Sequence, residues 1–347
     1  MSDSTPSQPD SNARRTLVTG GAGFIGSHLV RALLERGDDI TVIDNLSTGR
    51  RINLPAHHER LRFWEADLSA GLASMGAGER FDEIYHLAAA VGVKRILARP
   101  VESIETNVVE TAALLRFAES HGPAPDRGAR VLLASSSEVY GKSVAAPFAE
   151  GDDCVYGPTT ASRWSYACTK AIDEYLGLAH ATSGGLPVVI VRFFNTVGPR
   201  QIGEYGMVLP NFVRAALTDT PITVYGDGGQ SRCFCDVRDA VPAIVELLGR
   251  PNCFGRIFNL GSDELITIAE LAERVRTVLG SSSEIVTIPY DEAYGAGFED
   301  LRLRQPDLSS VRGAIGFERR IDLDDTIRDI ARWMREEQGF SVEAGAS

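Results

Sequence analysis

The sequence lacks several features that would assign a protein to a class on their own. No uninterrupted apolar stretch in the 347 residues approaches the roughly 20 that a membrane-spanning helix needs. Basic residues are in the minority, since 35 Lys and Arg stand against 47 Asp and Glu and leave a formal net charge of −12. A general nucleic-acid-binding protein needs a basic surface, so that class is not expected. An anionic ligand would have to be held by local arginines and helix ends.

Cysteine is also scarce, and its pattern argues against both disulfides and a metal site. The 5 cysteines form no C-x-x-C pair, and residues 1–12 are rich in Ser, Pro and Asp, without the apolar core of a signal peptide. We therefore expect a disordered tail over residues 1–13, reduced thiols and a cytoplasmic location. Cys233 and Cys235 fit alternation along a strand better than a fragment of a metal site, so no metal is expected. Residues 341–347 are expected to form a second flexible tail.

What the sequence does contain is a glycine pattern at residues 19–26, T-G-G-A-G-F-I-G, between a short apolar run and a longer periodic one. This order predicts a strand, a tight turn and a helix. Gly21, Gly23 and Gly26 fit G-x-G-x-x-G, whereas Gly20, Gly23 and Gly26 fit G-x-x-G-x-x-G. In either register the glycines allow a sharp turn, the close approach of a pyrophosphate and close helix–strand packing. The N-terminus of the helix then offers unpaired N–H groups to the phosphates.

An acidic residue at the end of the next strand indicates which dinucleotide is bound. Asp44 follows the apolar run of residues 40–43, about 20 residues after the glycines, where a carboxylate can bind a ribose 2′-OH. The same carboxylate would repel a 2′-phosphate. The sequence therefore predicts NAD rather than NADP as the cofactor.

Strand-like and helix-like runs alternate through the first half of the chain, which is typical of right-handed βαβ units and a parallel sheet covered on both faces. We therefore expect an α/β fold, with a Rossmann-type doubly wound parallel sheet over residues 14–198 and a smaller C-terminal α/β substrate domain over residues 199–340. Residues 237–262 are expected to pack back on the first domain. Strands are predicted at residues 15–19, 39–44, 61–65, 83–87, 130–135, 187–193, 222–225 and 285–288, and helices at residues 25–36, 104–120, 165–182, 208–217, 237–248, 268–279 and 324–338.

A second pattern, Tyr166-Ala-Cys-Thr-Lys170, supplies candidate chemistry. The i, i+4 spacing puts Tyr166 and Lys170 on one face of a helix. A tyrosine alone has a pKa of about 10, but a nearby ammonium and a positive nicotinamide favour its phenolate, so the pair can act as a general base. Ser135, Ser136 and Ser137 end a predicted strand upstream and could offer a hydroxyl to a substrate oxygen.

These patterns resemble the extended short-chain dehydrogenase/reductase superfamily. Three further segments share the resemblance: residues 86–89 (H-L-A-A), 135–141 (S-S-S-E-V-Y-G) and 192–199 (R-F-F-N-T-V-G-P). More narrowly, they are similar to its NAD-dependent nucleotide-sugar epimerases, dehydratases and decarboxylases, over about residues 15–333. The resemblance implies a nucleotide-sugar substrate, with a UDP-sugar favoured, and a cofactor that is reduced and reoxidised within one turnover.

The resemblance also implies roles for particular residues. Tyr166, Lys170, Ser136 and Glu138 would be catalytic. The implied cofactor contacts are Gly20, Gly23, Phe24, Ile25, Gly26, Asp44, Asn45, Asp67, Leu68, Leu87, Ala88, Ala89, Tyr166 and Lys170, and the implied substrate contacts are Ser136, Ser137, Asn195 at a phosphate, Tyr225 stacked on the base, and Arg232 and Arg304 at the diphosphate.

The sequence leaves the reaction undecided among several members of this group of enzymes. All of them begin with proton removal by Tyr166 and oxidation of the sugar at C4. A 4,6-dehydratase would carry an Asp/Glu pair, but Ser137-Glu138 lacks the aspartate. Glu138 matches the UDP-glucuronate decarboxylases. The helix after Tyr166, however, lacks the Tyr-Asp-Glu-Gly of those decarboxylases. Residues 157–165 resemble bacterial UDP-glucose 4-epimerase-like proteins. We predict a nucleotide-sugar 4-epimerase, with UDP-glucuronate decarboxylase as the alternative. A non-catalytic NAD sensor would need the glycine loop but not Tyr166, Lys170 and Ser136.

The helices predicted at residues 104–120 and 165–182 carry apolar residues around more than one narrow stripe. A helix of this kind is buried on two sides. The superfamily resemblance implies a homodimer packed through these two helices of each subunit, in a self-complementary two-fold contact.

Overall fold

The largest element of the computed structural model is a sheet of seven parallel strands. The structure describes residues 13–89, 99–124, 126–144, 146–203, 207–289, 292 and 302–338. Four of the five residues of the first strand, R-T-L-V-T, are buried, as expected for a parallel strand covered on both faces. The strands, in spatial order, are β11 (Arg256–Leu260), β6 (Val188–Phe193), β5 (Arg130–Ser136), β4 (Glu83–His86), β1 (Arg15–Thr19), β2 (Asp39–Asp44) and β3 (Leu61–Glu65).

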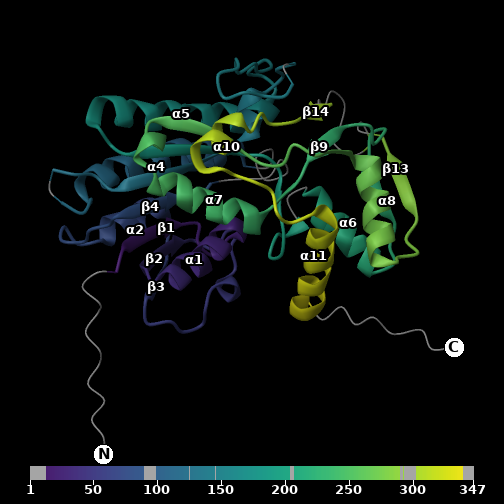
Figure 1. Ribbon diagram of the computed structural model, residues 1–347, viewed down its shortest axis with the longest axis horizontal. Coiled ribbons are helices and arrows are strands. Elements are labelled where there is room, and N and C mark those ends of the chain that lie inside the picture. Colours follow the sequence, from purple (N-terminus) through teal and green to yellow (C-terminus); the bar gives the residue numbers. More distant parts are fainter. Residues whose placement is uncertain are drawn as a thin grey trace, which may run out of the picture.

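Helices cover both faces of this sheet (Figure 1). Neighbouring residues of a strand point to opposite faces, so Leu17 and Val18 of β1 belong to two different apolar cores. One core is completed by α1 (Phe24–Arg36), α7 (Val237–Gly249) and α10 (Ser309–Ile315), and the other by α2 (Leu68–Ser74), α4 (Pro100–Ser120) and α5 (Ser165–Gly184). The predicted doubly wound α/β fold is confirmed.

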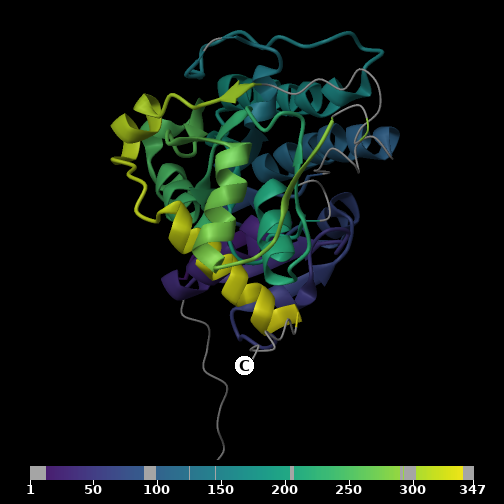
Figure 2. The same ribbon diagram turned by 90° about the vertical axis from the view of Figure 1, so that its right-hand side faces the viewer.

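A smaller lobe has its own apolar core, built by α6 (Val208–Leu217), α8 (Ile268–Leu279) and α11 (Leu323–Gln338) against the parallel pair β8 (Ile222–Tyr225) and β13 (Ile285–Ile288). Figure 2 shows α11, in yellow, crossing beside α8. The chain passes between the two lobes several times, because α7 and β11 return to the large sheet. Short strands complete the junction: β7 (Thr196–Val197) pairs with β10 (Cys235–Asp236), and β9 (Ser231–Cys233) pairs with β12 (Leu265–Thr267) and β14 (Leu303–Arg304).

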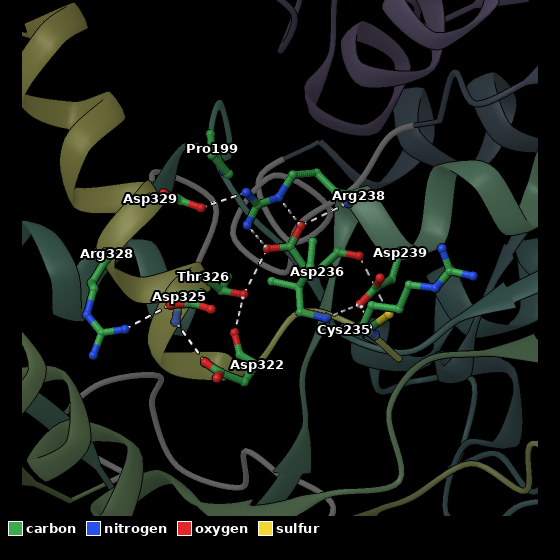
Figure 3. Close-up of polar contacts among 12 residues, drawn as sticks. Pro199, Cys235, Asp236, Arg238, Asp239, Asp322, Asp325, Thr326, Arg328 and Asp329 are labelled. Carbon is green, nitrogen blue, oxygen red and sulfur yellow. Dashed lines mark hydrogen bonds and ion pairs between the residues drawn. The ribbon is translucent and has the colours of Figure 1, made fainter. Parts of the chain in front are cut away.

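A charged cluster ties the start of α7 to α11 across the junction (Figure 3). The buried Asp236 caps α7 by accepting from the Arg238 backbone N–H at 2.9 Å. The Arg238 guanidinium bonds both oxygens of Asp236 and, at 2.6 Å, Oδ2 of Asp329 on α11. Thr326 Oγ1 donates to Asp236 Oδ2 at 2.8 Å. A buried carboxylate held by this many donors fixes the geometry of the contact between the lobes.

None of the helices in the described ranges combines the length and apolar character needed to cross a membrane. Several large apolar side chains of the adjacent helices α4 and α5 are nevertheless exposed in the single chain. Ile104 is 42% and Val109 56% exposed on α4, and Ile172 is 44% and Tyr175 75% exposed on α5. Exposed apolar side chains gathered on neighbouring helices are typical of a protein–protein contact.

We predict that these helices pack against the same helices of a second copy. The double variant Ile172→Glu/Tyr175→Glu places two charges in that contact and should leave a monomer. Light scattering at micromolar concentration should give about twice 37.5 kDa for the wild type and 37.5 kDa for the variant. A wild-type mass of 37.5 kDa would contradict the predicted dimer.

Candidate active site

One cleft of about 1530 Å³ opens at the carboxyl ends of the central strands and extends over the smaller lobe. The parallel direction of the strands brings their ends to one edge, where ligands of such folds bind. Of the residues that the sequence analysis implicated, Gly21 does not line this cleft. The following residues do: Gly20, Gly23, Phe24, Ile25, Gly26, Asp44, Asn45, Asp67, Leu68, Leu87, Ala88, Ala89, Ser135, Ser136, Ser137, Glu138, Tyr166, Lys170, Asn195, Tyr225, Arg232 and Arg304.

Two glycines of the loop between β1 and α1 allow backbone segments to pack closely together. Gly20 has a φ of +71°, and a Cβ there would lie 2.8 Å from the Ala88 backbone nitrogen. A Cβ at Gly26 would lie 2.1 Å from the Gly20 carbonyl oxygen. In the described chain no side chain caps α1 at Gly23, and its first turn carries no acidic residue. The tight turn and the N–H groups at the start of α1 fit the diphosphate of a dinucleotide.

Two carboxylates, those of Asp44 and Asp67, line the cleft near the glycine loop. Asp44, at the end of β2, accepts from the Ala22 N–H at 2.9 Å and from the Leu46 N–H at 2.8 Å. Burial raises the pKa of Asp44, although these backbone donors act in the other direction. The Asn45 amide donates to Asp67 Oδ1 at 2.8 Å. The Asp44 carboxylate is therefore anchored to the glycine loop, at the position expected to meet the adenosine ribose.

Tyr166 and Ser136 face the centre of the cleft from α5 and from the end of β5. Burial raises the pKa of Tyr166 well above its usual value, and the charges of Glu138 and Asp173 add to this, whereas a hydrogen bond with Ser136 lowers it. Ser136 Oγ also accepts from the Glu138 backbone N–H at 3.2 Å. Without a bound cofactor the phenol is thus protonated, and a positive nicotinamide is needed to favour its ionisation.

Lys170 has a partner that the sequence analysis did not name. Its buried ammonium donates to the buried Asp173 Oδ2 at 2.9 Å, one helical turn further along α5. Burial raises the pKa of Asp173, and Lys170 opposes that shift. A buried ammonium keeps its charge only when it is paired, so Asp173 compensates Lys170 in this low-dielectric position.

Glu138 lies between two arginines from different parts of the chain. Arg163 Nη1 donates to one of its oxygens at 2.8 Å, and Arg304 Nη1, from β14 of the smaller lobe, donates to the other at 2.5 Å. Burial alone would raise the pKa of Glu138, but the charges of Arg304 and Arg163 dominate and lower it to about 2. This group of three, hereafter the Glu138 triad, carries two positive charges and one negative charge beside Tyr166.

The remaining substrate-side residues come from the junction and the smaller lobe. Asn195 has a φ of +35°, and its amide donates to the Cys233 carbonyl at 2.9 Å, which holds the end of β9 against β7. Arg232 is buried on β9, and Tyr225 stands at the end of β8 with 36% of its surface exposed. An aromatic ring and a buried guanidinium at one end of the cleft fit a base and a diphosphate.

The sequence analysis missed Arg163, although its position offered a signal. It stands three residues before Tyr166, just ahead of α5, so its side chain reaches the same end of the helix. It also missed that Ser135 is not free. The Ser135 hydroxyl donates to the Glu174 carboxylate. The Arg192 guanidinium donates to both oxygens of the same carboxylate, at 2.9 and 2.7 Å. Ser135 therefore belongs to a buried support behind Ser136.

Comparison with known proteins places this geometry in a family. The model of the NAD-dependent epimerase/dehydratase family matches residues 16–261. The chain belongs to that family. NAD is accordingly its cofactor. The glycine loop, Asp44 and Lys170 line the cleft and are the residues that we expect to hold it.

Three similar proteins illustrate the range of reactions in the family. A UDP-N-acetyl-α-D-glucosaminuronate decarboxylase of Bacillus cytotoxicus is 38% identical over 93% of this chain and 98% of its own length. UDP-glucuronic acid decarboxylase 1 of Arabidopsis thaliana is 38% identical over 89% of this chain and 67% of its own length. The solved UDP-glucose 4-epimerase of Thermus thermophilus, in complex with NAD, has a TM-score of 0.79 at 29% identity and covers 93% of this chain and 99% of its own.

Asp44 should determine the choice between the two dinucleotides. Because its carboxylate repels a 2′-phosphate, we expect calorimetry to show NAD binding and much weaker NADP binding. Asp44→Ala should weaken NAD by roughly tenfold or more, the cost of a hydrogen bond to a charged group. Equal affinity of the wild type for NAD and NADP would show that Asp44 does not discriminate between a ribose 2′-OH and a 2′-phosphate.

Tyr166→Phe removes the ionisable oxygen and little volume. Folding and NAD binding should be kept, while turnover should fall by roughly 10²-fold or more, as for the loss of a general base. The comparison of steady-state turnover with NAD affinity in the same preparation separates the two effects. A variant with wild-type turnover would exclude Tyr166 from the chemistry.

Proposed function

We propose that the protein is an NAD-dependent decarboxylase of a UDP-uronic acid, either UDP-glucuronate or its 2-acetamido analogue. The observation that carries the proposal is the Glu138 triad, which brings two guanidinium groups together beside Tyr166 in a chain of net charge −12. A neutral hexose has no charged group to meet a guanidinium, whereas a uronic acid has its C6 carboxylate. The names of the similar decarboxylases support the same substrate class. The 4-epimerase expected from the sequence becomes the second candidate.

The reaction begins with the sugar C4 hydroxyl between Tyr166 and Ser136. Tyr166 takes the hydroxyl proton, Ser136 hydrogen-bonds the same oxygen, and Lys170 binds the nicotinamide ribose. Bound NAD supplies the acceptor for the C4 hydride and later returns it. The resulting C4 ketone stands β to the C6 carboxylate, so it can take up the electron pair of the C5–C6 bond.

Loss of carbon dioxide then breaks the C5–C6 bond and leaves an enolate whose charge rests on the C4 oxygen. The hydroxyls of Ser136 and Tyr166 are placed to stabilise that charge. C5 takes up a proton from water, which replaces the lost carboxylate. Tyr166 returns its proton to the C4 oxygen when the hydride is restored to C4, so no net oxidation occurs. With a pKa of about 2, Glu138 stays ionised at neutral pH and orients Arg163 and Arg304 rather than donating the proton.

The second candidate, 4-epimerisation, needs only the first oxidation and a turn of the keto-sugar before reduction. Tyr166, Ser136 and Lys170 suffice for it, and the similar Thermus thermophilus structure is named as such an enzyme. It gives no role to the two guanidinium groups of the Glu138 triad.

A panel of UDP-glucuronate, its 2-acetamido analogue and UDP-glucose separates the candidates. We expect one or both acids to lose carbon dioxide and give a UDP-pentose, followed by NMR, with no accumulation of NADH and no product from Tyr166→Phe. Conversion of UDP-glucose to its C4 epimer, with both acids inert, would contradict the decarboxylase and establish the epimerase.

A further inference from the structure

Asp173 is a buried carboxylate to which the proposed reaction gives no part in the chemistry. It lies on α5 one turn after Lys170, which itself lies one turn after Tyr166. The spacings of four and then three residues put the three side chains on one face of the helix. Along α5, the lysine therefore stands between the phenol that is expected to act as the base and a carboxylate.

The ion pair of Lys170 and Asp173 is almost completely withdrawn from solvent. The Nζ and Oδ2 atoms are 2.9 Å apart, and 3% of the lysine side chain and none of the aspartate side chain is exposed. Water screens such a pair very little, so the carboxylate offsets most of the field of the ammonium. Asp173 accepts one of the three N–H groups of the ammonium, and Lys170 also lines the cleft, where a ligand meets the others.

The other charged groups around this face of α5 are paired, neutral or exposed. Glu138 bonds two arginines in the Glu138 triad, and Glu174 bonds Arg192 of β6. Burial, together with the charge of Lys170, lowers the pKa of His86 on β4 to about 3, so its ring is neutral. The acidic residues of α4 that line the cleft lie at least partly in solvent: Glu102, Glu105 and Glu110. Asp173 is thus the acid that acts directly on Lys170.

This contact limits what Lys170 does for Tyr166. An unpaired ammonium would favour the phenolate, whereas the charge of Asp173 adds to burial and to Glu138 in raising the pKa of Tyr166. We propose that Asp173 is a positioning residue that acts through Lys170: its carboxylate holds the ammonium and offsets its charge, so that Tyr166 becomes a base only when NAD is bound. The phenol then ionises beside the positive nicotinamide, and the free enzyme holds no reactive phenolate.

The proposal rests on Tyr166 as the general base, which decarboxylation and 4-epimerisation share, and is independent of the choice between them. It assigns Asp173 no contact with either ligand. Its effect should therefore appear in the ionisation of Tyr166 more than in the affinity for NAD.

The first test is an ultraviolet titration of phenolate in the full chain after bound nucleotide has been removed. Because the chain has 9 tyrosines, the signal of Tyr166 is the difference between each protein and the same protein carrying Tyr166→Phe. Asp173→Asn keeps the shape and an acceptor for Lys170 but removes the negative charge. The ammonium is then no longer offset, so Tyr166 should ionise at a pH lower by roughly one unit or more.

The second test is the pH profile of kcat with NAD and whichever UDP-sugar is turned over. The acidic limb reports the base in the loaded enzyme, and Asp173→Asn should move it to lower pH as well. Asp173→Glu keeps the charge and should leave both curves close to those of the wild type. Glu105→Gln is the matched control, because it removes an exposed carboxylate from the same cleft, and it should change neither curve.

Calorimetry with NAD establishes that each variant is folded, and Asp173→Ser replaces Asp173→Asn if the latter does not fold. An ionisation pH that is unchanged or higher in the neutral variant would mean that Asp173 does not offset Lys170 toward Tyr166. Failure of both neutral variants to fold would mean that Asp173 serves only to stabilise the buried lysine. Either result overturns the proposal. The ultraviolet titration needs no turnover, so its failure is distinct from a failure of the decarboxylase assignment.

Discussion

All seven strands of the large sheet run in one direction, and most of the site depends on that constraint. Parallel strands bring their carboxyl ends to a single edge, so the turns after β1, β2, β4 and β5 meet there although they are far apart in sequence. The glycine loop, Asp44, Ala88 and Ser136 therefore share one cleft. The helices on both faces fix the strands, and the candidate site is built from the loops at the strand ends and from the start of α5.

The Glu138 triad then couples this edge to the smaller lobe. Arg304 comes from β14 and Glu138 from the turn after β5, so the ion pair joins the end of the large sheet to the small sheet at the junction. Buried ion pairs contribute little net stability, because desolvation offsets most of their attraction. A contact of this type is better explained by the position and charge it gives to the cleft beside Tyr166. The second link between the lobes, from Arg238 to Asp329, lies outside the residues that line the cleft and serves the geometry of the junction.

Periodicity made most of the fold predictable from the sequence, since the long helices and the central strands show clear apolar patterns. The elements that the sequence did not predict include short ones, such as α2 with only seven residues. The strand β11 was expected only as part of the segment of residues 237–262 that packs back on the first domain. The site shows the same limit. Glu138 and Arg304 were each singled out, but one as catalytic and the other as a diphosphate ligand. Their contact spans 166 residues and follows from tertiary packing, which a local motif does not contain.

The distribution of arginines shows how an acidic chain can bind two anionic ligands. With a net charge of −12, long-range attraction does not favour a nucleotide, so affinity must come from cations at short range in a low-dielectric cleft. Arg163 and Arg304 both bond Glu138, Arg232 is buried on β9, and Arg200 stands beside α1. Each cation is thus oriented before the ligand arrives, which reduces the entropy lost on binding. Selectivity among anions then follows from where each guanidinium is held rather than from the overall charge of the protein.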